Sequence, residues 1–174
     1  MSGSDTNAVK LSLRVDGPIY AALQQDARSE KREVTEHIQR ILAEFVIAKK
    51  LLDAEKAKEY QLMWSLVARA VEAAQLICRN GEFGSNITYK AIQACMADKS
   101  WASDYEKYVQ DNPYKHGNPR KGTINKEIGF RIREGIDGQV IKTSDGKPAK
   151  VTVTGSIIQS YTPMKTFAQT AVQD

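Results

Sequence analysis

Three polar side chains near the start of the chain alternate with apolar ones. Lys10, Ser12 and Arg14 fall on one face of an extended segment, because successive side chains of a strand point to opposite faces. The other face takes four apolar side chains: Val9, Leu11, Leu13 and Val15. The polar face presents an ammonium, a hydroxyl and a guanidinium, all hydrogen-bond donors, and its two cations favour an anionic partner.

This strand needs a partner and a support. An isolated strand is unstable in water, so residues 9–15 must pair with a later strand of the chain or with the same strand of a second copy. Residues 16–18, "DGP", are typical of a helix start, and residues 34–46, "VTEHIQRILAEFV", carry apolar side chains at helical spacing. Because Gly and Pro are absent between Pro18 and Gly81, we expect the second helix to run on as a helical connector over residues 49–59.

One strand followed by two amphipathic helices in residues 9–46 resembles the ribbon-helix-helix proteins of the Arc/MetJ type. The resemblance implies that two chains pair their strands antiparallel and insert alternate strand side chains into the major groove of DNA. The matching base-contacting positions are Lys10, Ser12 and Arg14. Arg and Lys can reach guanine O6 and N7, and Ser can bond to either kind of base pair.

The family also places the N-terminus of its second helix against a DNA phosphate. On this chain the resemblance assigns that contact to Lys31, Arg32 and the amides of Val34 and Thr35. Lys31 stands where the family often has glycine, and Glu33 stands where it has a small hydroxyl residue. The alternative interpretation makes residues 9–15 an edge strand of a mixed sheet, with its cations merely solvated.

The second half of the chain predicts four more helices and a hairpin. The helices are expected over residues 60–78, 88–97, 101–110 and 123–136, with an irregular loop at 111–122 because it holds two prolines and two glycines. Residues 140–160 predict two strands around Asp145-Gly146, and 162–174 a loosely held tail. The order of elements is topologically similar to a winged helix, with residues 123–136 as its recognition helix.

Basic residues concentrate in this region, since six Lys or Arg lie between residues 115 and 133 against one carboxylate, Glu127. If a winged helix is present, these residues and the hairpin form a second DNA surface. Its members are Arg120, Lys121, Asn125, Lys126, Arg131, Arg133, Lys142 and Lys147. The nearby tyrosines Tyr105, Tyr108 and Tyr114 are expected in the core or a lid.

Composition and spacing argue against several other classes. The two cysteines, Cys78 and Cys95, lie within apolar helical patterns and predict reduced core residues, and His37 and His116 are too far apart to suggest a metal site. No catalytic set, phosphate-binding glycine loop or cofactor motif is recognisable, so we expect neither an enzyme nor a cofactor. The absence of a leader-like or membrane-spanning pattern predicts a cytoplasmic protein with no membrane partner.

These patterns predict a mainly α protein with short β segments. A flexible arm, residues 1–8, precedes a dimeric ribbon-helix-helix domain, 9–48, and the connector 49–59 leads to an α+β domain, 60–161, with a winged-helix-like hairpin. The expected function is sequence-specific binding of double-stranded DNA by a homodimer or higher even oligomer, as in a prokaryotic, plasmid or phage repressor. The alternatives are an antitoxin that grips a protein partner with its C-terminal domain, and an oligomeric adaptor without DNA binding.

Overall fold

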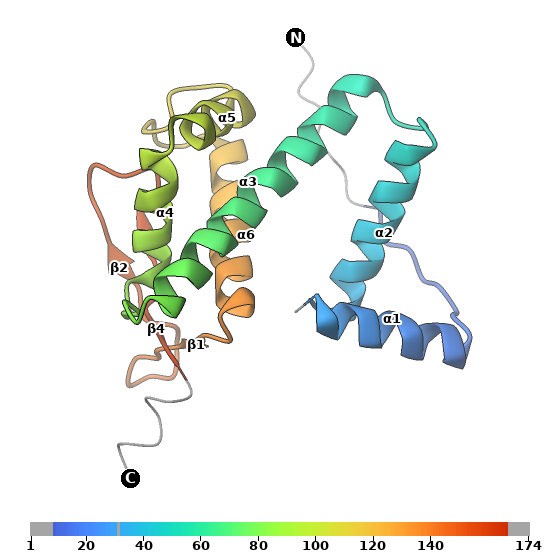
Figure 1. Cartoon of the computed structure of the whole chain (residues 1–174), viewed down its shortest axis with the longest axis horizontal. Coiled ribbons are helices and arrows are strands. Elements are labelled where there is room, and N and C mark those ends of the chain that lie inside the picture. The colour runs from blue at the N-terminus through green and yellow to red at the C-terminus, as the bar shows by residue number, and fades with distance from the viewer. Residues whose placement is uncertain (1–8, 31, 167–174) are drawn as a thin grey trace. The chain divides into compact units, whose positions relative to one another are not determined.

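The computed structural model describes residues 9–30 and 32–166, which form a mainly helical protein with a few short strand pairs. Its contacts divide the chain into two compact units, Met1–Phe45 and Val46–Asp174. Figure 1 labels the helices and strands of both units. No helix in the part of the chain that the structure describes is long and apolar enough to cross a membrane.

The first unit holds two helices and an extended lead. Residues 9–16 have neither helix nor strand in the single chain, so the paired strand stays a prediction. Helix α1, Gly17–Ser29, begins where Pro18 supplies a helical φ without needing a hydrogen bond. Helix α2, Val34–Ala48, agrees with the predicted second helix. Among the described residues of this unit, only Ala27 and His37 are buried, which is too little for a core.

The second helix does not continue into the connector, and the expectation of an unbroken helix is wrong. Helix α2 ends at Ala48, and Lys50 takes a left-handed φ of 55°. Helix α3, Ala54–Arg79, then starts afresh, because the Asp53 side chain accepts a 2.8 Å hydrogen bond from the Lys56 amide. Residues 54–59 are therefore the first turns of a long helix.

The second unit packs three further helices around α3. They are α4, Ile87–Ala97, α5, Lys99–Val109, and α6, Pro119–Gly135. Along α6, Ile124, Ile128 and Ile132 are fully buried against α3, as their spacing of four predicts. In the same core the Trp101 indole stacks on Tyr105, with ring centroids 5.0 Å apart, and donates its N–H to the Leu66 carbonyl.

The predicted loop is shorter than expected, because α6 already begins at Pro119. Proline is accepted in the first helical turn, where its missing N–H has no partner to lose, and the Asn118 side chain caps the helix by accepting from the Lys121 amide. Three residues expected in the loop, Arg120, Lys121 and Gly122, are thus helical. Of the three tyrosines, Tyr105 and Tyr108 are in the core, whereas Tyr114 is half exposed.

The hairpin prediction is only partly right. A turn does form at Asp145-Gly146, with a bridge between Lys142 and Pro148, but the flanking strands pair elsewhere. Strand β1, Gln139–Val140, pairs antiparallel with β4, Met164–Lys165, and β2, Val151–Thr152, pairs with β3, Ser160–Tyr161. The start of the expected loose tail is therefore a strand, and Met164 is buried in the core.

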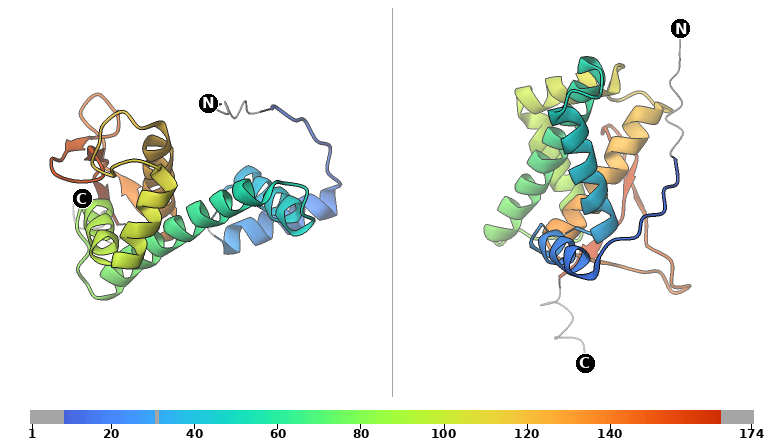
Figure 2. Two further views of the ribbon diagram at one scale, coloured as in Figure 1. Left: turned by 90° about the horizontal axis from the view of Figure 1, so that it is seen from above. Right: turned by 90° about the vertical axis from the view of Figure 1, so that its right-hand side faces the viewer.

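These strands lie beside the helical layer of the second unit, as the two views of Figure 2 and the orange-to-red segment of Figure 1 show. The C-terminal segment is tied to α4 and its preceding loop: the Met164 amide donates to the Ser85 carbonyl, and the Tyr161 ring stacks on Tyr89 with centroids 6.0 Å apart. It is tied to α6 by the Asn125 amide, which donates to the Ile157 carbonyl. The segment therefore spans α4 and α6.

Candidate functional site

The predicted base-contacting residues lie in residues 9–16, which are exposed to solvent and form neither helix nor strand. Lys10, Ser12 and Arg14 are all exposed, and no hydrogen bond or ion pair involving them is found within the described parts of the chain. The apolar side chains between them are also exposed, with 69% of Leu11 and 59% of Leu13 accessible to solvent. The single chain leaves both faces of this segment in water.

The predicted phosphate-contacting residues sit at the junction of α1 and α2. Val34 and Thr35 open α2, in the turn where a helix leaves backbone N–H groups without an intrahelical acceptor. The Arg32 guanidinium is 4.0 Å from the carboxylate of Glu30 and largely covered. Lys31 lies outside the described residues. Nearby, His37 is buried and its Nε2 lies 2.8 Å from Oδ2 of Asp26, which ties the two helices together.

Of the eight residues predicted as a second DNA surface, four line a single pocket and four lie outside its lining. Arg120 is held within the fold, since its guanidinium pairs with Glu59 and donates to the Tyr108 carbonyl. Arg131 lies 3.4 Å from Glu127, and Lys147 lies 2.9 Å from Asp145 on the exposed turn that also carries Lys142. The four that line the pocket are Lys121, Asn125, Lys126 and Arg133.

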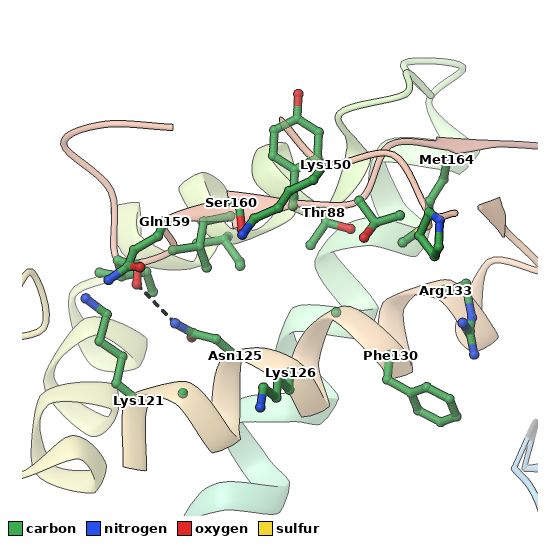
Figure 3. A pocket seen from close by; sticks show the side chains of 18 of the residues that line it. Thr88, Lys121, Asn125, Lys126, Phe130, Arg133, Lys150, Gln159, Ser160 and Met164 are labelled. Atoms are coloured by element: carbon green, nitrogen blue, oxygen red, sulfur yellow. Dashed lines mark hydrogen bonds between the residues drawn. The ribbon is translucent and has the colours of Figure 1, made fainter. Parts of the chain in front are cut away.

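This pocket is a groove between α6 and the C-terminal segment, and its volume is about 820 Å³ (Figure 3). One side is the α6 stripe Gly122, Asn125, Lys126, Gly129 and Arg133, whose spacing of three and four residues keeps them on one face of the helix. The opposite side comes from residues 148–150 and 157–162, and Thr88 and Ile92 of α4 also line the groove. Apolar side chains include Ile157, Ile158, Phe130, Tyr161 and Met164.

All the charged residues that line the groove are basic. Four cations line it, namely Lys121, Lys126, Arg133 and Lys150, and none of its lining residues is an Asp or Glu. Lys126 and Lys150 are exposed, and Arg133 is partly covered with its guanidinium 4.7 Å from the Phe130 ring centroid. Arg133 is paired with Glu134, a residue outside the groove lining. The electrostatic potential of the groove therefore favours an anion.

Lys121 lies deep in the groove. It is only 4% exposed, and its ammonium donates a 3.0 Å hydrogen bond to the Lys115 carbonyl. No carboxylate among the described residues lies within ion-pair distance of it, and burial lowers its pKa from the ordinary value. A buried ammonium without a counter-ion is costly, so an anion in the groove would be stabilised by it.

Asn125 joins the groove to the core. Its Oδ1 accepts a 2.7 Å hydrogen bond from the Tyr105 hydroxyl, and its Nδ2 donates a 3.0 Å bond to the Ile157 carbonyl. Burial raises the pKa of Tyr105 above its usual value, so the phenol stays protonated as the donor. Since both ends of the amide are engaged inside the protein, Asn125 fixes the opposite sides of the groove at a set distance.

Thr88 is a groove residue that the sequence prediction missed. It lies in the first turn of α4 and is 6% exposed, and its hydroxyl oxygen is buried without a hydrogen-bond partner. Figure 3 shows it between α6 and the C-terminal segment. Buried hydroxyls without partners are rare, because each loses its bonds to water. The groove also contains Gly122 and Gly129, which the sequence prediction did not include; their spacing of seven residues, two helical turns, places them on one face of α6.

The cysteines and the possible metal ligands form neither a disulfide nor a metal site in the part of the chain that the structure describes. Both cysteines are free, and burial raises the pKa of the Cys95 thiol to about 11, which keeps it unreactive as a core residue. Across residues 9–30 and 32–166, no three His, Cys, Asp or Glu side chains gather in a way that could hold a metal ion. Comparisons with family models, curated proteins and solved structures find no match for this chain.

Proposed function

We propose that this protein is a dimeric, sequence-specific double-stranded DNA-binding protein that acts as a transcriptional regulator through its first unit. In this proposal two copies pair residues 9–15 as an antiparallel ribbon, as in ribbon-helix-helix proteins, and pack their α1 and α2 helices together beneath it. The second unit is free to bind another molecule or to join the dimers into a larger even oligomer.

The observation that carries the proposal is the unsatisfied apolar surface of the first unit. Large apolar side chains are exposed on all three of its segments, for example 59% of Leu13, 56% of Ile19 and 54% of Phe45. Fully burying one such side chain is worth about 1.5–3 kcal/mol, so a second copy that covers several of them gains a dimer interface. A unit whose described residues bury only Ala27 and His37 needs such a partner to acquire a core.

Pairing two copies of residues 9–15 would also order the polar face. With Leu11 and Leu13 turned toward α2, Lys10, Ser12 and Arg14 would all point away from the core, which is the arrangement that base reading requires. These side chains are exposed and make no internal ion pair, so they pay no cost of breaking one when DNA binds. The described strands β1 to β4 pair with one another, and this supports a second copy of the chain as the partner of residues 9–15.

The experiment is selection of binding sites from a random duplex pool at one fixed, moderate salt concentration. The full-length protein is compared with a variant in which Lys10, Ser12 and Arg14 are all replaced by alanine. The matched control is the double variant Lys99→Ala, Lys107→Ala. It also removes two positive charges, but from exposed positions of α5. We expect the wild type and the control to enrich one palindromic site and the triple variant to enrich none.

Two results would contradict this proposal. If all three proteins enriched the same site, base reading would belong to the second unit. If none enriched a site and no duplex bound at low salt, the protein would be an oligomeric adaptor rather than a DNA-binding protein. Counter-ion release dominates non-specific binding, which makes affinity depend on salt. The selection and the low-salt binding measurement are therefore each carried out at one salt concentration for all three proteins.

A further inference from the structure

The groove of the second unit has the construction of a ligand site. Two polar residues of its lining, Lys121 at one end and Thr88 further along the groove, are more than nine-tenths buried (Figure 3). The Thr88 hydroxyl has no hydrogen-bond partner, and the Lys121 ammonium has no carboxylate partner among the described residues. Both groups can donate to an acceptor that enters the groove.

The groove is kept open by glycine. Gly122 and Gly129 lie on the groove face of α6, and a Cβ added at either position would have no protein atom within 4 Å. Packing within the protein therefore does not require glycine there, and glycine weakens a helix interior relative to alanine. The missing side chains instead leave space beside Asn125 and Lys126, where a ligand can approach the helix backbone.

The charge and the surface of the groove define a class of ligand. Lys121, Lys126, Lys150 and Arg133 supply donors for a multiply charged anion, and phosphate oxygens match both ammonium and guanidinium geometry. The apolar side chains of Ile157, Ile158 and other lining residues suit an organic group. A volume of about 820 Å³ is within the range of small-molecule sites.

We propose that this groove binds a phosphorylated organic molecule of nucleotide size, with a phosphate on the buried Lys121 ammonium and its organic part along the apolar wall beside Thr88. The depth of these two residues distinguishes the ligand from duplex DNA, whose backbone would rest on the exposed rim. Lys121 and Arg133 are twelve residues apart on α6, a span of about 18 Å, which is enough for a nucleoside carrying several phosphates. The inference is independent of DNA binding by the first unit.

The test is isothermal titration calorimetry of the full-length protein with each of the four ribonucleoside triphosphates, with inorganic phosphate and with an eight-residue oligothymidylate. We expect at least one nucleotide to bind at one site per chain, at least tenfold more tightly than inorganic phosphate. Equal affinity for inorganic phosphate and for the nucleotides would show that the groove binds phosphate alone and does not recognise an organic group. Binding of the oligothymidylate alone would reassign the groove to single-stranded nucleic acid, and the absence of any binding would overturn the proposal.

Three variants separate a ligand site from a structural feature. Thr88→Val keeps the side-chain volume and removes the unpartnered hydroxyl, so we expect a higher melting temperature together with at least fivefold weaker nucleotide binding. Gly129→Leu is expected to fill the groove, to leave the protein folded and to abolish binding. Lys107→Met, on α5 and outside the groove, is the charge control and should bind as the wild type does. Unchanged binding by Gly129→Leu would show that the nucleotide lies elsewhere.

Discussion

The Tyr105 hydroxyl donates a 2.7 Å hydrogen bond to Oδ1 of Asn125, and through it the aromatic core of the second unit holds one side of the groove. Tyr105 is fully buried and stacked on Trp101, whereas Asn125 lies on the groove face of α6. The other end of the Asn125 amide reaches the Ile157 carbonyl on the opposite side. A change in the core at Tyr105 is therefore expected to reach the groove.

This relationship predicts how stability depends on alkaline pH. Burial raises the pKa of Tyr105 above the ordinary value of 10.0, so the folded state disfavours the tyrosinate. The resulting stability is fully present below pH 10 and is lost as the pH rises further, because the unfolded chain ionises first. We expect the free energy of unfolding, measured in urea from pH 8 to 11, to fall less steeply for Tyr105→Phe than for the wild type. Tyr105→Phe should also cost about 1 kcal/mol at pH 8 through the lost hydrogen bond. Parallel pH profiles would contradict this assignment.

Leu13 is expected to hold the dimer together. Leu13→Asp places a carboxylate in the apolar face of the proposed ribbon, where burial of an unpaired charge is costly. Sedimentation velocity should show a monomer, and specific DNA binding should disappear with the dimer. Leu76→Asp is the matched control, because Leu76 is also a half-exposed leucine but lies on α3 in the second unit. A stable Leu13→Asp dimer would refute the ribbon model.

Arg14 is expected to contribute more to sequence preference than to total affinity. A bidentate contact to guanine discriminates against the wrong base by about 1–3 kcal/mol. Arg14→Ala should therefore reduce the difference in binding free energy between specific and non-specific duplexes by about 1–3 kcal/mol. The measurement is competition binding of the selected site against a scrambled duplex at fixed salt. Lys121→Met is the control, since its ammonium is buried and should not reach a duplex. Equal losses with both duplexes would make Arg14 a phosphate contact instead.

The protein is expected to lose stability in acid when the Asp98 carboxylate becomes protonated. Its carboxylate caps α5, and hydrogen bonds from Ser100 and from the Arg69 guanidinium lower its pKa from 3.8 to about 2. The stability that depends on the ionised form is therefore present above pH 4 and is lost as the pH falls through about 2. We expect the melting temperature of the wild type to fall more between pH 5 and pH 2 than that of Asp98→Asn. If the two proteins lost stability equally over this range, another carboxylate would be responsible.

Two glycines of α6 are expected to respond in opposite directions to alanine. A Cβ at Gly135 would lie 2.5 Å from Cγ1 of Val71, so Gly135→Ala must displace α3 side chains, at about 1–3 kcal/mol. A Cβ at Gly129 meets nothing within 4 Å, so Gly129→Ala should stabilise the helix by about 0.5–1 kcal/mol. Chemical denaturation of both variants provides the check. Stabilisation by Gly135→Ala would show that α3 and α6 are less tightly packed than described.

Local patterns predicted most helices, because helix periodicity and capping depend on neighbouring residues. The spacing of Ile124, Ile128 and Ile132 placed the buried face of α6 correctly, and the segment "ITYKAIQACMA" is helical as expected. The errors fall at helix ends. Pro119 starts α6 although prolines and glycines around it predict a loop, and α2 ends at Ala48, two residues before the left-handed Lys50, although no Gly or Pro follows it before Gly81.

The strand partners and the groove could not be predicted in this way. Strands of two residues carry too little pattern to specify a register, so the pairing of β1 with β4 depends on how the C-terminal segment packs on α4 and α6. Thr88, Lys121 and Lys150 are far apart in sequence, and only that packing brings them to one groove.

The sequence by itself thus determined the buried face of α6, the alternation of polar and apolar side chains at residues 9–15 and the excess of positive charge after residue 115, since each is a local property. The tertiary structure alone decided which cations are paired internally and which surround an open groove. The reason is physical: the charge of Arg120 is neutralised by Glu59 and that of Lys121 is not, and this difference depends on contacts between distant parts of the chain.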